Sequence, residues 1–469
     1  MESLFRLREN NTTVGREVVA GITTFVTMAY IVFVNPSILG LAGMDTGAVM
    51  LATCIGAAIG TFIMGLMSNY PFAQAPGMGL NAFFAFTICG SLGYTWQAGL
   101  AAVFISGIIF IIITVTGLRE AVVNGIPASL KKAISAGIGV FIAYIGVKNA
   151  GLLTFTSDPG TYQMFGDSPE SATIVAGAGA VPAFSFASPT AILSIIGLVI
   201  TVALVTKKLK GALIIGIAIT SVIGAILQFA SGGAFNVGIT PPGKFELPSL
   251  APTFGKFGEG FGQLFTTDQG IGVAIISVVT ILISLTLVDM FDTIGTLIGT
   301  ASKAGFLDKD GNLPRARQAM MADAIATTAG AVIGTSTVTT YVESTAGVSA
   351  GGRTGLTSVT TGVLLLLSIF LAPVLGFVPS GATAPILIIV GVMMASSLKD
   401  IDWPDWRTSV PCFFTVVFMP FAYSISDGIA MGFIFYVIIN AFSGKAKEVS
   451  PVMYVFAALF ALRYVFLNV

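Results

Sequence analysis

Four acidic residues lie inside stretches that otherwise carry almost no charge, and they are the groups of this chain best placed to do chemistry: Asp289, Asp292, Asp323 and Glu343. Asp289 and Asp292 are three residues apart, so a helix would place both on one face. Inside a lipid bilayer a carboxylate costs about 3 kcal/mol even on insertion scales, and it therefore usually faces a cavity or a partner. We treat all four as candidate functional groups.

Proton binding is the chemistry that these acids favour. The chain has no histidine, which removes the commonest proton carrier near neutral pH. No lysine or arginine lies inside the stretches around the acids, so at least one of Asp289, Asp292 and Glu343 is expected to bind and release a proton during function. The alternative is structural, with the carboxylates bonded to unwound backbone. Asp323 stands about two turns into its helix and could simply cap or pair.

The elements that must position these residues are membrane spans. The chain has 469 residues, of which 55% are hydrophobic and only 9% charged, and its mean hydropathy is +0.93. A soluble domain carries about 25% charged residues. Residues 46–118 and 354–398 contain no charge at all, and both stretches are far longer than one crossing of about 20 residues. These features exclude a soluble enzyme and a nucleic-acid-binding protein.

The charge pattern predicts an all-α polytopic membrane protein with fourteen spans and a cytoplasmic N-terminus. With this count most of the 22 Lys and Arg residues fall in the cytoplasm, and only Lys148, Lys244 and Lys256 fall outside. The spans are expected at 17–39, 47–68, 72–90, 97–117, 130–148, 189–206, 211–230, 271–300, 317–334, 336–351, 354–375, 382–398, 407–423 and 426–443. A further amphipathic stretch follows at 452–467.

The spans are expected to form two seven-span repeats of opposite orientation. Residues 1–16 would be a cytoplasmic N-terminus, 17–230 the first repeat, 231–270 an external loop, 271–443 the second repeat and 444–469 a C-terminal amphipathic segment. The external segment 149–188 and the loop 231–270 lack the composition of separate folded domains. Because seven is odd, equivalent spans would cross the membrane in opposite senses.

Spans three and ten are predicted to be broken, since both are rich in residues that favour irregular backbone. Broken segments at matching positions indicate a site near the middle of the membrane. The candidate substrate-binding residues are Gly79, Leu80, Asn81 and Phe83 in span three, Asp289 in span eight, and Thr340, Glu343 and Ser344 in span ten. The amide of Asn81 offers a donor and an acceptor to a planar heterocycle. Its alternative role is to satisfy freed backbone groups.

No metal site or cofactor is expected. The three cysteines, Cys54, Cys89 and Cys412, are far apart in apolar runs, which disfavours a zinc site or a disulfide. The coupling ion would be the proton, carried by Asp289, Asp292 and Glu343.

Several motifs in order resemble the AzgA-like purine permeases, within the nucleobase/ascorbate transporter group of the xanthine/uracil permease superfamily. They are REVVAGITTF at 16–25, APGMGLNAFF at 75–84, DMFDT at 289–293, YVESTAG at 341–347 and GGRTGLT at 351–357. The resemblance covers essentially the whole chain. It implies a core of spans one to four and eight to eleven, a gate of spans five to seven and twelve to fourteen, and a homodimer.

The resemblance also implies a function. It implies a cell-membrane symporter that imports adenine, guanine or hypoxanthine with protons by alternating access, and it places the purine at Asn81, Asp289 and Glu343. The span-three motif favours guanine and hypoxanthine. The partners expected are thus a purine nucleobase and the lipid bilayer, with no nucleic acid.

Two other readings remain open. An anion carrier of the same inverted-repeat fold is the main alternative, although central carboxylates would repel an anion. An intramembrane enzyme or a passive channel is the other. The lack of histidine and of a nucleophile with its base disfavours an enzyme, and a channel would not accumulate its substrate against a gradient.

Overall fold

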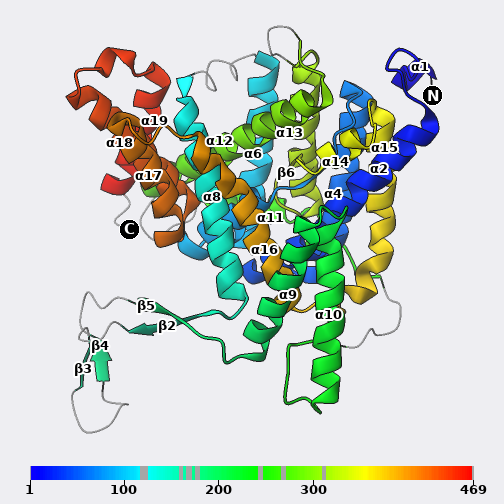
Figure 1. Cartoon of the computed structure of the whole chain (residues 1–469). Coiled ribbons are helices and arrows are strands. Elements are labelled where there is room, and N and C mark those ends of the chain that lie inside the picture. The colour runs from blue at the N-terminus through cyan, green and yellow to red at the C-terminus, as the bar shows by residue number, and fades with distance from the viewer. Residues whose placement is uncertain are drawn as a thin grey trace.

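A computed structural model of the chain describes residues 2–116, 125–157, 162–164, 172–174, 180–240, 247–265, 271–308 and 313–466. The described part is mostly helical (Figure 1). Its first half contains α1 (Glu2–Phe5), α2 (Val14–Met28), α3 (Ile31–Leu39), η1 (Gly40–Ala42), α4 (Thr46–Ile63), η2 (Met64–Ser68), β1 (Gln74–Pro76), α5 (Met78–Ala82), η3 (Phe83–Ser91), α6 (Trp96–Thr116), α8 (Ala128–Asn149), β2 (Leu153–Ser157), β3 (Tyr162–Met164), β4 (Ala172–Ile174), β5 (Ala180–Phe184), α9 (Pro189–Thr206) and α10 (Ala212–Ala230).

The second half begins with a short helix, α11, that packs on α6. Its elements are α11 (Phe257–Leu264), α12 (Ile271–Ala304), α13 (Ala316–Ile333), β6 (Val338–Thr340), α14 (Ser344–Ser349), α15 (Gly355–Leu367), η5 (Ser368–Phe377), α16 (Ser380–Ala395), η6 (Ser396–Asp400), α17 (Trp406–Phe421), α18 (Ile425–Phe442), η7 (Ala446–Glu448) and α19 (Pro451–Phe466). The label η marks 3-10 and π helices.

The prediction of a polytopic helical membrane protein is confirmed. Among the described residues, ten helical segments are long and apolar enough to cross a bilayer. Each of the fourteen expected spans falls on a helix or on a short strand followed by a helix. The arrangement of the spans as two inverted repeats stays a prediction. The amphipathic stretch after 450 forms the helix α19, which packs on α18 and α12.

The segment between α8 and α9 contains more regular structure than its composition indicated. β2 pairs antiparallel with β5, and β3 pairs antiparallel with β4. These strands lie at the end of the molecule opposite the N-terminal helices (Figure 1).

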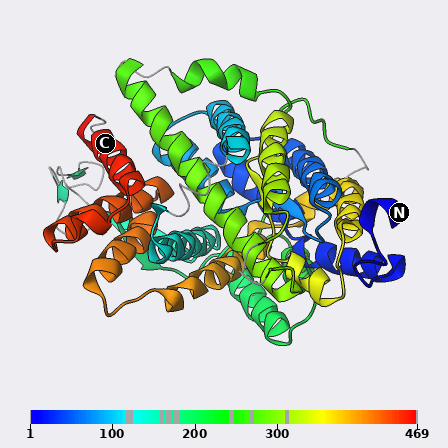
Figure 2. The same cartoon turned by 90° about the horizontal axis from the view of Figure 1, so that it is seen from above.

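The helices pack in two groups, which contain the helices of the expected core and gate except for span eight, the helix α12. The first group contains α2, α3, α4, α6, α13 and α15, and the second contains α8, α9, α10, α16, α17 and α18. The long helix α12 runs diagonally between them when the molecule is seen from above (Figure 2). We call the groups the core group and the gate group.

Small residues allow the close packing inside the gate group. A Cβ on Gly139 of α8 would lie 2.7 Å from the carbonyl oxygen of Gly391 on α16. The reverse substitution at Gly391 would be still tighter, at 2.4 Å from the carbonyl oxygen of Gly139. Glycine at both positions therefore lets the two backbones touch, as small residues do in membrane helix pairs.

Spans three and ten are broken where the sequence predicted it. In place of continuous helices they contain β1 and β6, which pair antiparallel with Gln74 opposite Thr340 and Pro76 opposite Val338. Each strand gives the other the backbone partners that a lone extended segment would lack in a membrane. Two short helices, α5 and α14, then lead away from this crossing.

Candidate functional site

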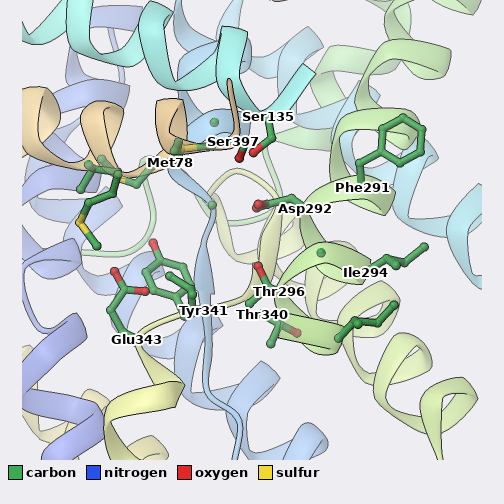
Figure 3. Close-up of a pocket in the computed structure, with 18 of the residues that line it drawn as sticks. Met78, Ser135, Phe291, Asp292, Ile294, Thr296, Thr340, Tyr341, Glu343 and Ser397 are labelled. Atoms are coloured by element: carbon green, nitrogen blue, oxygen red, sulfur yellow. The ribbon is translucent and has the colours of Figure 1, made fainter. Parts of the chain in front are cut away.

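A cavity of about 610 Å³ lies beside the β1–β6 crossing, between the core group and the gate group (Figure 3). Its wall on the core and α12 side, which we call the core wall, contains Tyr30, Gly77, Met78, Gly79, Phe291, Asp292, Thr296, Thr340, Tyr341 and Glu343. The facing wall, which we call the gate wall, contains Lys131, Lys132, Ser135, Val390, Met393, Met394 and Ser397. A molecule in the cavity would touch both groups.

Glu343 enters the cavity just before α14 begins, at the turn that follows β6. The hydroxyl of Tyr30, at the break between α2 and α3, donates to Glu343 Oε1 over 2.7 Å. The Thr27 hydroxyl is 3.5 Å from the Glu343 backbone carbonyl. The carboxyl group is therefore held by the first span while its second oxygen stays available to the cavity.

The strands of the crossing are fixed by a buried carboxylate behind the cavity. Asp323 of α13 accepts hydrogen bonds from the Gln74 side chain at 3.1 Å, from the Thr340 backbone N–H at 3.0 Å and from the Thr340 hydroxyl at 3.1 Å. Its other oxygen accepts from the Thr293 hydroxyl of α12 at 2.7 Å. Asp323 thus connects both broken spans to α12 through hydrogen bonds. This is the pairing role that the sequence analysis gave as one possibility for this residue.

Asp289 and Asp292 are separated by the structure although they share one side of α12. Asp292 lines the cavity, whereas Asp289 is buried and 3.5 Å from the Thr327 hydroxyl of α13. Three residues turn a helix by about 300°, which leaves the two side chains about 60° apart. That angle is enough to direct one carboxylate into the cavity and the other toward α13.

Of the candidate substrate residues in the two broken spans, the cavity brings together Gly79, Thr340 and Glu343. Leu80 and Phe83 are buried in the hydrophobic core. Asn81 is buried, and its side-chain carbonyl accepts a hydrogen bond from the Ser336 hydroxyl. The Ser344 hydroxyl accepts from the Ala73 backbone N–H at 2.9 Å, which extends the strand crossing. These last four residues lie outside the cavity lining.

An aromatic cluster lies between the two groups farther along α8. We define it as Phe86 of η3, Phe141 and Tyr144 of α8, and Tyr423 between α17 and α18. The ring of Tyr423 lies 5.5 Å from those of Phe86 and Phe141 and 6.2 Å from that of Tyr144. The Lys148 ammonium group lies 4.7 Å from the Tyr423 ring and donates to its hydroxyl at 3.2 Å.

The cavity and the aromatic cluster occupy different levels of α8. The cavity is lined by Lys131, Lys132 and Ser135, in the first two turns of the helix. The α8 residues of the cluster, Phe141 and Tyr144, lie in the second half of the helix. The cavity therefore lies beside the beginning of α8, and the aromatic cluster lies toward the end of this helix.

The described residues contain no group of three or more Cys, Asp or Glu side chains placed to hold a metal ion. The cysteines are separate, with Cys54 and Cys412 buried and Cys89 partly buried.

Comparison with known proteins identifies the family. The pattern of the Permease family (Xan_ur_permease) matches residues 15–431. The chain belongs to this family. It is 41% identical to the adenine permease AdeP of Escherichia coli K12, with 100% of this chain and 96% of that protein covered. It is 40% identical to the guanine/hypoxanthine permease PbuG of Bacillus subtilis 168, with 100% of both covered.

Solved structures resemble the permease in fold. The transmembrane domain of the cyanobacterial bicarbonate transporter BicA aligns with a TM-score of 0.59 at 14% identity, covering 89% of this chain and 97% of that one. SLC26A9 aligns with a TM-score of 0.60 at 13% identity, covering 91% of this chain and 65% of that one. The permease is therefore a multi-pass membrane transporter and not an enzyme.

Several cavity residues of the permease were not among the sequence candidates. Tyr30 and Tyr341 each stand next to a backbone break, and this position was a signal that could have identified them. Ser135 and Ser397 belong to helices that the sequence assigned to the gate, and no motif distinguishes them from the chain's other serines. Only the packing of α8 and α16 against the core group places these two in the cavity.

Proposed function

We propose that this permease imports purine nucleobases with protons across the cell membrane by alternating access, with guanine and hypoxanthine favoured and adenine accepted. The observation that carries the proposal is a single cavity between the core and gate groups that contains both Glu343 and Asp292. Two relatives whose names state purine bases, each matched over its full or nearly full length, support the choice of substrate.

The chemistry of the cavity suits a neutral base with ring N–H groups. A carboxylate accepts such hydrogen bonds and gains strength because it is charged. Glu343, held by the Tyr30 hydroxyl, is the proposed acceptor for the base. A planar ring can also lie against Tyr341, another residue of the core wall.

Proton coupling is assigned to the pair Asp289 and Asp292. The two acids lie on neighbouring faces of α12, one in the cavity and one toward α13. They would repel each other if both were charged, and we assign one proton to the pair. Binding or release of that proton would alter the cavity next to the base. Glu343 can contribute to the same exchange.

We propose alternating access because the cavity and the aromatic cluster lie between the same two helix groups at different levels of α8. The cavity lies beside the first turns of α8, and the rings of Phe86, Phe141 and Tyr423 are in contact nearer the end of this helix. Movement of the core group against the gate group would part the ring of Phe86 from those of Phe141 and Tyr423 and open the opposite side. We further propose that the N-terminus is cytoplasmic, which would place the beginning of α8 and the cavity beside it toward the cytoplasm. We also propose that the permease is a homodimer.

An anion carrier is the competing proposal, because BicA shares the fold. Two carboxylates in the cavity disfavour it, since an anion would have to enter against their charge. Lys131 and Lys132 also line the cavity, near the beginning of α8. Lys132 is exposed and its ammonium group donates to the Asp400 carbonyl at 3.1 Å.

Proteoliposomes with an imposed pH gradient test the proposal. Wild-type protein should bind hypoxanthine and accumulate it against its gradient. Glu343→Gln should lose binding, because the amide presents donors where an acceptor is needed. Asp289→Asn and Asp292→Asn should still bind and exchange the base but lose proton-driven accumulation. Full accumulation by both Asn variants would refute the assignment of the proton site, and bicarbonate or sulfate uptake without base uptake would refute the substrate.

A further inference from the structure

Two serine hydroxyls face the carboxylates from the gate wall. Ser135 belongs to α8 and Ser397 to η6, directly after α16. Both side chains point into the cavity toward Asp292, which enters from α12 on the other side (Figure 3). Among the described residues, no hydrogen bond joins either hydroxyl to another group.

Three of the four hydroxyl groups of the core wall already donate a hydrogen bond within the protein. The Tyr30 hydroxyl donates to Glu343. The Tyr341 hydroxyl donates to the Pro76 carbonyl at 2.5 Å. The Thr340 hydroxyl donates to Asp323. Each has one proton to give, so of the core-wall hydroxyls only that of Thr296, one turn after Asp292, stays available to a ligand as a donor.

A purine base needs donors as well as acceptors. Hypoxanthine presents two acceptors on one edge, O6 and N7, and an N–H donor next to O6. Ionised carboxylates can take the N–H but give nothing to the acceptors. An acceptor left without a partner in a buried site weakens binding. Besides the Thr296 hydroxyl, a protonated Asp292 and the ammonium groups of Lys131 and Lys132, the hydroxyls of the gate wall can supply donors for the O6/N7 edge.

We propose that Ser135 and Ser397 donate hydrogen bonds to the O6/N7 edge of the bound base while the core-wall carboxylates accept from its N–H groups. This inference rests on the proposed function and assigns two specificity-determining residues to it. The base is then held between the two helix groups and not by the core alone. Because a hydroxyl also accepts, the same pair can face a 6-amino group.

The location of the serines explains why a bound base would couple the two groups. Ser135 lies one turn after Lys131 on α8, and Ser397 lies where α16 gives way to η6. Neither helix contributes a carboxylate to the cavity. A ligand that satisfies both walls therefore joins elements that otherwise move apart when access alternates.

Binding of three ligands to four proteins tests the proposal. The ligands are hypoxanthine, 7-deazahypoxanthine, which lacks N7, and unsubstituted purine, which lacks O6 and the neighbouring N1–H. The effect of each substitution is compared with wild type for the same ligand. The proteins are wild type, Ser135→Ala, Ser397→Ala and the control Ser396→Ala, and binding is measured by competition against labelled hypoxanthine. The control removes an exposed hydroxyl that donates to the Met393 carbonyl and that lies outside the cavity lining.

Each of Ser135→Ala and Ser397→Ala should weaken hypoxanthine binding about three- to tenfold, the usual range for one neutral hydrogen bond. The loss should nearly vanish with the analogue that lacks the bonded acceptor, and Ser396→Ala should match wild type. Wild-type hypoxanthine affinity in both cavity variants would overturn the inference, as would an equal loss with all three ligands. If the wild type binds adenine instead of hypoxanthine, the same competition measurements on the four proteins are made with adenine and 7-deazaadenine. A wild type that binds neither base would refute the proposed function together with the inference.

Discussion

Asp323 offers a sharp test of whether an acid inside a span serves structure or proton transfer. One oxygen of its carboxylate accepts three hydrogen bonds, from the Gln74 side chain and from the backbone and hydroxyl of Thr340. The other oxygen accepts one, from Thr293. Thr293 also shares a hydrogen bond of 2.9 Å with the Thr339 hydroxyl, in which either group can donate.

Asp323→Asn is expected to preserve this network. The amide oxygen can replace the oxygen that accepts three bonds, and the amide NH2 then faces Thr293. The Thr293 hydroxyl can rotate to accept from the NH2 and donate to Thr339, so the four donors that Asp323 now serves can each keep a partner. Asp323→Ala instead leaves the buried backbone N–H and hydroxyl of Thr340 without an acceptor, each worth about 1–3 kcal/mol. The Gln74 amide would keep only its 3.3 Å bond to the Thr340 hydroxyl, and Thr293 could donate only to Thr339. With partial relaxation we expect a loss of roughly 3–5 kcal/mol in the free energy of unfolding.

Thermal unfolding of the purified protein in detergent, followed by base binding, measures the difference. Asp323→Asn should unfold near the wild-type temperature and bind the base within about threefold of wild type. Asp323→Ala should unfold at a clearly lower temperature or fail to fold. Equal destabilisation by both substitutions would refute the hydrogen-bond account. A stable Asn variant that binds the base but does not accumulate it would assign Asp323 to the proton path.

Three further predictions concern Tyr30, Gly79 and the orientation of the chain in the membrane. Tyr30→Phe removes the donor that holds the carboxylate of span ten and should weaken base binding roughly tenfold, corresponding to about 1.4 kcal/mol; unchanged affinity would exclude this role. Gly79→Ala places a Cβ 2.7 Å from Ile138 Cγ2 of the gate group, so uptake should fall, and Ile138→Ala in the same chain should restore it. Cysteines introduced at 182–184 should react with an impermeant thiol reagent applied to intact cells, whereas one beside Lys208 should not; the reverse pattern would overturn the proposed orientation.

Much of the fold could be predicted from the sequence because membrane spans obey local rules. Length and hydropathy alone identify a segment that can cross the bilayer, and the fourteen predicted segments all fall on helical or strand–helix elements. The broken spans were also predictable, since Gly77, Pro76 and the Ser/Thr-rich stretch before Glu343 favour irregular backbone. What the composition of 149–188 did not indicate were the hairpins β2–β5 and β3–β4, whose pairing depends on contacts between strands.

The sequence by itself determined that this protein lies in a membrane, where its chain breaks, and which acids stand in its spans, because each of these properties depends on neighbours along the chain. Only the tertiary structure decided that Asp292 faces the cavity while Asp289 faces α13, and that Asn81 bonds to Ser336. It also brought Ser135 and Ser397 to the same space as Glu343. The physical reason is that helix periodicity gives the relative directions of side chains on one element, whereas the partner that each side chain meets depends on how distant elements pack.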